Sequence, residues 1–187
     1  RRIASYLKKA GHQVTVVREP GGTRLAERIR RLLLDFRSAD LALPAELFLY
    51  LAARGQLYAE VISPALARGD VVICDRFTDS TLAYQGDGRG FPVPLLRQLN
   101  DLSTAKRRPD LTLFLDLPLS ISNRRKGKVA DRLENEQELF YKRVLRGFRR
   151  LAKTEPKRVV RIDARHDVDR VTQQIREILD QRIGRRR

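Results

Sequence analysis

One stretch decides the fold: Asp70-Val-Val-Ile-Cys-Asp-Arg-Phe-Thr-Asp-Ser-Thr-Leu-Ala-Tyr-Gln-Gly-Asp-Gly-Arg-Gly90. Val71 to Cys74 is apolar and largely β-branched, which is typical of a strand buried on both faces of a parallel sheet. The run ends abruptly at Asp75 and Arg76. Ligands of open α/β sheets bind beyond the carboxyl ends of the strands, so we expect Asp75 and Arg76 to lie in a ligand crevice.

Polar side chains follow this strand exit. Ser80, Tyr84 and Gln85 add a hydroxyl, a phenol ring and an amide, and glycines at 86, 88 and 90 let the backbone turn. An isolated Asp-Arg pair at a strand end is more often a solvated ion pair than a binding site. The residues around it favour a binding site here.

A second strand exit strengthens this interpretation. Val14 to Val17 is another short β-branched run, and it leads into Arg18-Glu-Pro-Gly-Gly-Thr23 before an amphipathic helix capped by Thr23. Two strands that end in arginine and a carboxylate indicate an anionic ligand, with a divalent cation as an option, because guanidinium suits bidentate phosphate contacts.

Composition limits the class of protein. The 187 residues fit one domain, 1–187, with no apolar run of 18 residues and no export signal, so we expect no membrane contact. The single cysteine, Cys74, reads as a small buried hydrophobe and suggests a reducing cytoplasm. The net charge of +16 invites a nucleic-acid interpretation. Much of it is dispersed over expected helix faces, as at Arg149 and Arg150, which are usually solvated.

The order of elements predicts an α/β fold. Strands alternate with helices along the chain, which predicts a three-layer sandwich with a mainly parallel central sheet flanked by helices. A long helix is expected from Ala45 to about Ala67. Tyr50 and Arg54 are four residues apart on it, so they form either a stacking platform for a base with a donor for its edge or a tyrosine packed under an arginine stem.

A basic segment at residues 123–132 interrupts the second half of the chain. It holds Arg124, Arg125, Lys126 and Lys128 and few apolar residues. Such a segment is usually a surface loop. In a phosphoryl-transfer enzyme it is also the usual form of a lid that brings cations to the transferred phosphate.

Six motifs occur together in the order and spacing of a known family, so that the chain resembles bacterial thymidylate kinases over nearly all its length. They are Arg18-Glu-Pro-Gly-Gly-Thr23, Tyr50-Leu-Ala-Ala-Arg54, Asp75-Arg-Phe77, Ser80-Thr-Leu-Ala-Tyr-Gln-Gly-Asp-Gly-Arg89, Arg108-Pro-Asp-Leu-Thr-Leu-Phe-Leu-Asp116 and Asp131-Arg-Leu-Glu134. The resemblance implies a P-loop nucleoside monophosphate kinase-like fold and transfer of the γ-phosphoryl group of ATP to dTMP with Mg²⁺. It also implies a cytoplasmic homodimer whose partners are dTMP and ATP, without nucleic acid.

The resemblance also implies roles for the acceptor site. Tyr50, where most members have Phe, would stack on thymine, and Arg54 would reach the base edge. Arg76 would hold the dTMP phosphate, with Asp75 beside it for metal or water. The remaining acceptor contacts would come from Glu19, Arg30, Ser80, Tyr84 and Gln85, with Tyr84 as the sieve against a 2′-hydroxyl.

In the same way the resemblance implies that the basic segment binds ATP through Arg124, Arg125, Lys126 and Lys128. Arg124 or Arg125 would be the cation that acts in the transition state. Asp75, Arg76, Arg124 and Arg125 are therefore the candidate catalytic residues.

One departure from the family is large. A P-loop kinase needs G-x-x-x-x-G-K-[ST] after its first strand, because those N–H groups and the lysine cradle the phosphates of ATP. The sequence contains no such motif, and it contains no methionine. We expect that roughly 20 residues, including a central strand, precede Arg1 in the natural protein.

Three alternatives stay open at this point. Another deoxynucleotide or nucleoside kinase would share the Asp-Arg exit but is not expected to carry all six motifs. An inactive relative without a P-loop would match the sequence as it stands. A basic nucleic-acid-binding module would explain the charge, but it leaves the glycine turns and acid-base pairs at the strand ends unexplained.

Overall fold

The structure is a computed structural model that describes residues 1–125, 132 and 136–183. Its strands are β1 (Val14–Arg18), β2 (Val71–Asp75), β3 (Thr112–Asp116) and β4 (Val159–Asp163). Its α-helices are α1 (Arg2–Lys9), α2 (Arg24–Leu34), α3 (Leu43–Leu57), α4 (Ser63–Ala67), α5 (Thr78–Thr81), α6 (Val93–Ser103), α7 (Leu119–Arg125), α8 (Glu138–Thr154) and α9 (Val168–Ile183). A 3₁₀ turn η1 (Phe36–Ser38) and two π-helical segments, η2 (Tyr58–Ile62) and η3 (Leu82–Gly88), complete the described elements.

The predicted parallel pairing of strands is confirmed. β1 pairs with β2 from Val14↔Val71 to Arg18↔Asp75, and β3 pairs with β4 from Thr112↔Val159 to Asp116↔Asp163. Within the described residues the two pairs are separate two-stranded sheets. Each strand ends in a charged residue at its carboxyl end, so the register sets Arg18 directly beside Asp75.

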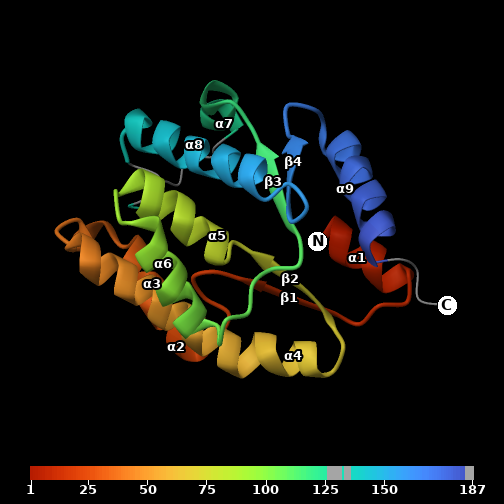
Figure 1. Ribbon diagram of the computed structural model, residues 1–187, viewed down its shortest axis with the longest axis horizontal. Coiled ribbons are helices and arrows are strands. Elements are labelled where there is room, and N and C mark those ends of the chain that lie inside the picture. The colour runs from red at the N-terminus through yellow and green to blue at the C-terminus, as the bar shows by residue number, and fades with distance from the viewer. Residues whose placement is uncertain (126–131, 133–135, 184–187) are drawn as a thin grey trace.

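Helices cover both faces of the strands, as Figure 1 shows. One core joins α3, η3, α6 and α8 to the inner face of β3 through Phe114. The other core joins α1 and α9 to the opposite face through Leu113. Neighbouring residues of a strand point to opposite faces, so Phe114 packs against one helical layer and Leu113 against the other. The strands therefore lie between two layers of helices, which is the expected three-layer arrangement.

The burial of β2 differs from the prediction. Val71 to Cys74 was expected to be buried on both faces, but all four residues are only half-buried. The prediction is wrong because, among the described strands, β2 has a hydrogen-bonded neighbour on one edge only. Leu115 of β3 is likewise 51% exposed.

The helices follow the sequence pattern closely. Thr23 caps α2 as expected, accepting a hydrogen bond from the amide of Ala26 at 3.1 Å. The long helix predicted up to Ala67 is one helical run from Leu43 that widens to π geometry at Tyr58–Ile62. Among residues 1–125, 132 and 136–183, no helix combines the length and apolarity needed to cross a membrane.

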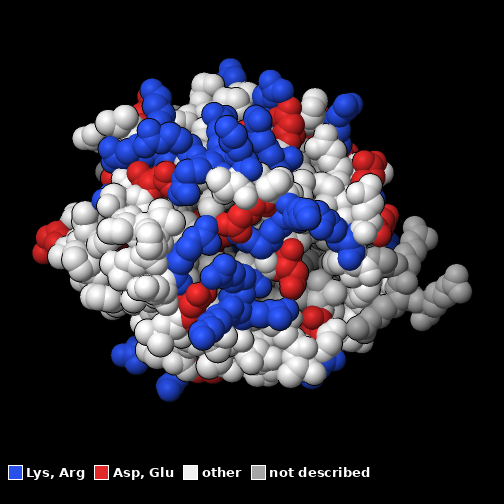
Figure 2. Space-filling view, viewed as in Figure 1, with Lys and Arg blue, Asp and Glu red and all other residues white. Residues whose placement is uncertain are grey.

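Arg149 and Arg150 of α8, which were expected to be solvated, have side chains that are 48% and 37% exposed, and each also forms an ion pair. Arg149 donates two hydrogen bonds to the buried carboxylate of Asp116, and Arg150 bonds Asp87 at 2.7 Å. On the face drawn in Figure 2, basic side chains gather over the centre and the top of the view, and acidic side chains lie among them. Part of the positive charge is therefore paired with carboxylates of the protein.

Candidate active site

The two predicted strand exits meet at one place. The amide of Glu19 donates to the carbonyl of Asp75 at 2.9 Å, which extends the β1–β2 pairing one residue beyond Arg18. Asp75 and Arg76 are exposed there. The carboxyl ends of β1 and β2 thus present an acid and a base side by side.

Arg76 has an unusual backbone conformation. Its φ of +67° lies in the left-handed region, which non-glycine residues rarely occupy. This conformation accompanies a side chain that lies over the ring of Tyr84, with its guanidinium carbon 4.9 Å from the ring centroid. The structure therefore brings Asp75, Arg76 and Tyr84 together, as the sequence predicts.

Behind this exit, Glu19 and Arg54 form a buried ion pair. Their side chains are 5% and 2% exposed, and three N···O contacts of 2.7 to 3.1 Å join them. Burial raises the pKa of Glu19 above its ordinary value, although Arg54 acts in the opposite direction. Glu19 links the end of β1 to α3.

The remaining donors of Arg54 are also engaged. Nη1 donates to Thr81 at 2.7 Å and to Asn100 at 2.6 Å, and Nη2 donates to the carbonyl of Phe77 at 3.2 Å. All five N–H groups therefore have acceptors within the protein. Any contact of Arg54 with a bound base must share a donor that is already in use. The sequence places Thr81 near the strand exit, but it does not predict the bond from Arg54 to Thr81 or any role for Asn100, since nothing in their local pattern marks them as partners of Arg54.

The loop between β1 and α2 is held by Glu27. Glu27 accepts a hydrogen bond from the amide of Gly22 at 2.8 Å and pairs with Arg18. The hydrogen bond from Gly22, together with Arg18, keeps the pKa of Glu27 below its ordinary value. Gly21 has a φ of +136°, which favours glycine, and a Cβ atom there would lie 2.5 Å from the carboxylate and displace it. Sequence reasoning missed Glu27, which reads as an ordinary first-turn acid.

The other acceptor candidates lie around these groups at different depths. Arg30 donates to the carbonyl of Pro20 at 2.8 Å, in the same loop that Glu27 holds. Tyr50 is half-buried and packs against the core of α2 and α3. Ser80 is half-buried, and Gln85 is almost fully buried at 4% exposure.

The basic segment is described only at its two ends. Arg124 is exposed at the end of α7. Arg125 donates to the carbonyls of Ala164 and Arg165 at 2.9 and 3.1 Å, so it lies at the turn between β4 and α9. Lys126 and Lys128 lie outside the described residues.

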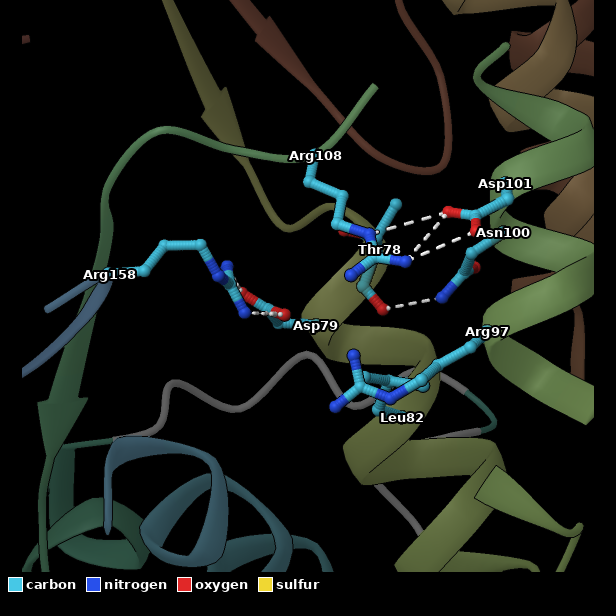
Figure 3. A pocket seen from close by; sticks show the side chains of 8 residues that line it. All are labelled: Thr78, Asp79, Leu82, Arg97, Asn100, Asp101, Arg108 and Arg158. Carbon is cyan, nitrogen blue, oxygen red and sulfur yellow. Dashed lines mark hydrogen bonds and ion pairs between the residues drawn. The ribbon is translucent and has the colours of Figure 1, made fainter. Parts of the chain in front are cut away.

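A small cavity lies beside the Arg54 network and is drawn in Figure 3. Its volume of about 20 Å³ suits roughly one water molecule. Asp79 and Arg158 line it as an ion pair with contacts of 2.7 and 2.8 Å, and Arg108 donates to Asp101, which also lines it. The charges here are already paired, so the cavity is part of the scaffold.

A solved structure resembles this arrangement over most of its length. The crystal structure of thymidylate kinase from Ehrlichia chaffeensis superposes with a TM-score of 0.76 and is 36% identical, covering 95% of this chain and 87% of that chain. Parallel strands between two helical layers, with an acid and an arginine at the strand exits, together with this likeness define the nucleoside monophosphate kinase class of α/β proteins.

Sequence comparisons narrow the class. The family profile described as thymidylate kinase matches residues 1–175. A thymidylate kinase of Desulfovibrio desulfuricans is 47% identical over 98% of this chain and 89% of its own length. One of Geobacter sulfurreducens is 45% identical over 100% of this chain and 91% of its own length. The chain belongs to the thymidylate kinase family. It is a phosphotransferase that converts dTMP to dTDP.

Proposed function

We propose that dTMP binds at the joined exits of β1 and β2, with its phosphate on Arg76, and accepts the γ-phosphoryl group of ATP. The observation that carries this proposal is the left-handed Arg76, whose guanidinium lies over Tyr84 beside the exposed Asp75. A guanidinium is always charged and forms two parallel bonds to a phosphate. Arg30, held at the carbonyl of Pro20, is the second phosphate contact.

The base and sugar of dTMP are assigned to neighbouring residues. Tyr50 stacks on thymine, and Arg54 lies one turn further along the same face of α3, where it shares a donor with the base edge. Glu19 acts through Arg54, since it holds the guanidinium on two sides. Tyr84 excludes a 2′-hydroxyl, and Ser80 and Gln85 complete the contacts with the nucleoside.

ATP and the transferred phosphate are assigned to the basic segment. Arg124, Arg125, Lys126 and Lys128 supply positive charge, which stabilises the oxygens on which charge develops during transfer. Arg124 is exposed at the end of α7 and has access to solvent and ligand. Residues 123–132 act as a lid within a single kinase domain, 1–187.

Mg²⁺ fits the donors at the acceptor site. No group of three or more His, Cys, Asp or Glu side chains suited to a metal occurs in the part of the chain that the structure describes. Mg²⁺ is commonly held by one or two carboxylates together with substrate phosphates and water, which the exposed Asp75 can satisfy. When bound, the ion neutralises phosphate charge, and Asp75 is the residue that would hold it or its water.

The protein is proposed to act as a cytoplasmic homodimer. Large apolar side chains are exposed on α2 and α3, with Leu32 at 56% and Phe48 at 59%, and such surfaces often mark protein interfaces. The sequence has a single cysteine, which can form no disulfide within the chain and suits a reducing compartment. No nucleic-acid partner is proposed, because arginines such as Arg149 are paired with carboxylates of the protein.

Titration calorimetry tests the acceptor assignment. Wild-type protein should bind dTMP more tightly than dGMP or dAMP, and Tyr50→Ala should weaken dTMP binding by about 1–3 kcal/mol if base stacking is lost. Equal affinity for the three nucleotides would remove the thymine assignment.

For the basic segment, Arg124→Ala with Arg125→Ala in the full-length protein should lower kcat strongly while dTMP affinity changes little. An unchanged kcat would leave the segment without a chemical role.

A further inference from the structure

One buried carboxylate has no role in the assignments above. Glu46 is in the first turn of α3 and is only 1% exposed. Acids in a first helical turn usually face solvent, where they interact with the helix dipole. A fully buried carboxylate needs charged partners to remain in the fold, and Glu46 has two arginines.

The two arginines approach Glu46 from distant parts of the chain. Arg89 donates to it from Nε at 3.1 Å and from Nη2 at 3.2 Å, and Arg132 donates from Nη2 at 2.5 Å. The side chains of Arg89 and Arg132 are 13% and 9% exposed. We call these three residues, with Glu136, the Glu46 cluster, because Arg89 also bonds Glu136 at 2.5 Å. Its two acids balance its two bases.

Arg132 is anchored on three sides. Besides Glu46, its Nε donates to the carbonyl of Leu33 at 3.0 Å, and its backbone amide donates to the carbonyl of Leu34 at 3.2 Å. The end of α2 and the start of α3 thus hold Arg132 together. In sequence, Arg132 closes the basic segment that begins at Asn123. The place of Arg132 therefore fixes one end of that segment.

Glu46 also belongs to the acceptor face of α3. Glu46, Tyr50 and Arg54 are spaced four residues apart, so they lie on one face of the helix. Arg89 follows directly after η3, which carries Tyr84 and Gln85. The Glu46 cluster therefore joins the helix proposed to hold the base, the segment after the sugar contacts and the end of the basic segment.

We propose that Glu46 is a positioning residue that sets the end of the basic segment relative to the acceptor site. It acts through Arg132, with Arg89 bracing its carboxylate from the other side. The proposal rests on the acceptor site proposed above. It differs from a purely structural role because it expects the rate of phosphoryl transfer, and not the binding of dTMP, to depend on the bond between Glu46 and Arg132.

The test uses Glu46→Gln, Arg132→Lys and the double variant in the full-length protein. Glutamine keeps the shape and an acceptor but loses the charge, and lysine keeps the charge but loses the planar fork. Each single variant should lower kcat about tenfold to a hundredfold, the scale produced by a displacement of about 1 Å. The dissociation constant of dTMP should change less than about threefold. The double variant should be no slower than the slower single variant, because both changes break one coupling.

The matched control is Glu155→Gln. Glu155 also pairs with two arginines, Arg97 and Arg158, but at the amino end of β4. The Glu155→Gln variant should have a lower melting temperature and a kcat within about twofold of wild type.

The proposal is overturned if Glu46→Gln keeps the wild-type kcat, if the losses of the two single variants multiply, or if Glu155→Gln loses kcat equally. Should Glu46→Gln fail to fold, Arg132→Lys alone decides, because an unchanged kcat in it refutes the coupling. Tyr50→Ala serves as a separate check, since unaltered dTMP affinity in that variant would refute the acceptor site and not the role of Glu46.

Discussion

Replacement of Arg54 by leucine should destabilise the fold in a way that depends on pH. The change removes the guanidinium and leaves the Glu19 carboxylate, 5% exposed, without its partner. Breaking a buried ion pair from one side costs about 3–5 kcal/mol. Glu19 can avoid an unpaired charge by binding a proton, and from an ordinary pKa of 4.5 this costs about 3.4 kcal/mol at pH 7. The two values agree.

The same reasoning gives the sign of the pH effect. In Arg54→Leu the folded pKa of Glu19 lies above the unfolded value, so the folded state binds the proton more tightly. Stability is therefore favoured at low pH and is lost as the pH rises above the unfolded pKa. Relative to wild type, the loss should shrink between pH 7 and pH 5, because removal of Arg54 raises the pKa of Glu19 beyond the level that burial gives it in the wild type.

Urea unfolding at both pH values, with thermal melting at pH 7, measures this effect. A loss of 3–5 kcal/mol corresponds to a melting temperature lower by about 6–20 °C for a domain of this size. The control replaces both partners, Arg54→Leu with Glu19→Leu, and should recover most of the stability and lose the pH dependence. A loss below about 1 kcal/mol at pH 7, or the same loss at pH 5 and pH 7, would refute the reasoning.

Three further outcomes are expected. Arg76→Ala should reduce kcat/KM for dTMP far more than Arg146→Ala, an exposed arginine of α8, and comparable losses in steady-state kinetics would mean that the phosphate site lies elsewhere. Glu27→Gln should lower stability above pH about 4.5, with the two proteins converging as the pH falls through the lowered pKa of Glu27; a constant difference in urea titrations would contradict this. Gly88→Ala should cost about 1–3 kcal/mol in thermal unfolding, because its Cβ would lie 2.7 Å from the ring of Phe140, and an unaltered melting temperature would show that the ring can move aside.

The strand exits could be predicted from sequence because their signal is local. The end of the β-branched run marks Asp75 and Arg76 as the strand exit. Parallel pairing of the two strands then places Asp75 beside Arg18. The helices could be predicted equally well, since their apolar spacing and caps lie within a few residues of one another. The half-burial of β2 could not be predicted, because it depends on which strand lies at each edge of β2.

The buried charges could not be predicted for a different reason. The partners of Arg54 include Glu19, 35 residues away, and Asn100, 46 residues away. Glu46 meets Arg132 across 86 residues. No local pattern distinguishes these side chains from solvated ones, because only the tertiary fold decides which arginine comes within reach of which acid. The ion pair between Arg149 and Asp116, 33 residues apart, shows the same limit.

The backbone at Arg76 bears on how this protein responds to selection. A left-handed non-glycine residue costs about 1–3 kcal/mol, and the fold tolerates this only because other contacts hold it in place. Glycine would adopt the same conformation without that cost. A library of variants screened for heat resistance alone should therefore enrich Arg76→Gly. That variant lacks the side chain proposed to bind the phosphate of dTMP. Stability and activity would then make opposite demands on residue 76, and only a screen that selects for both is expected to retain the arginine.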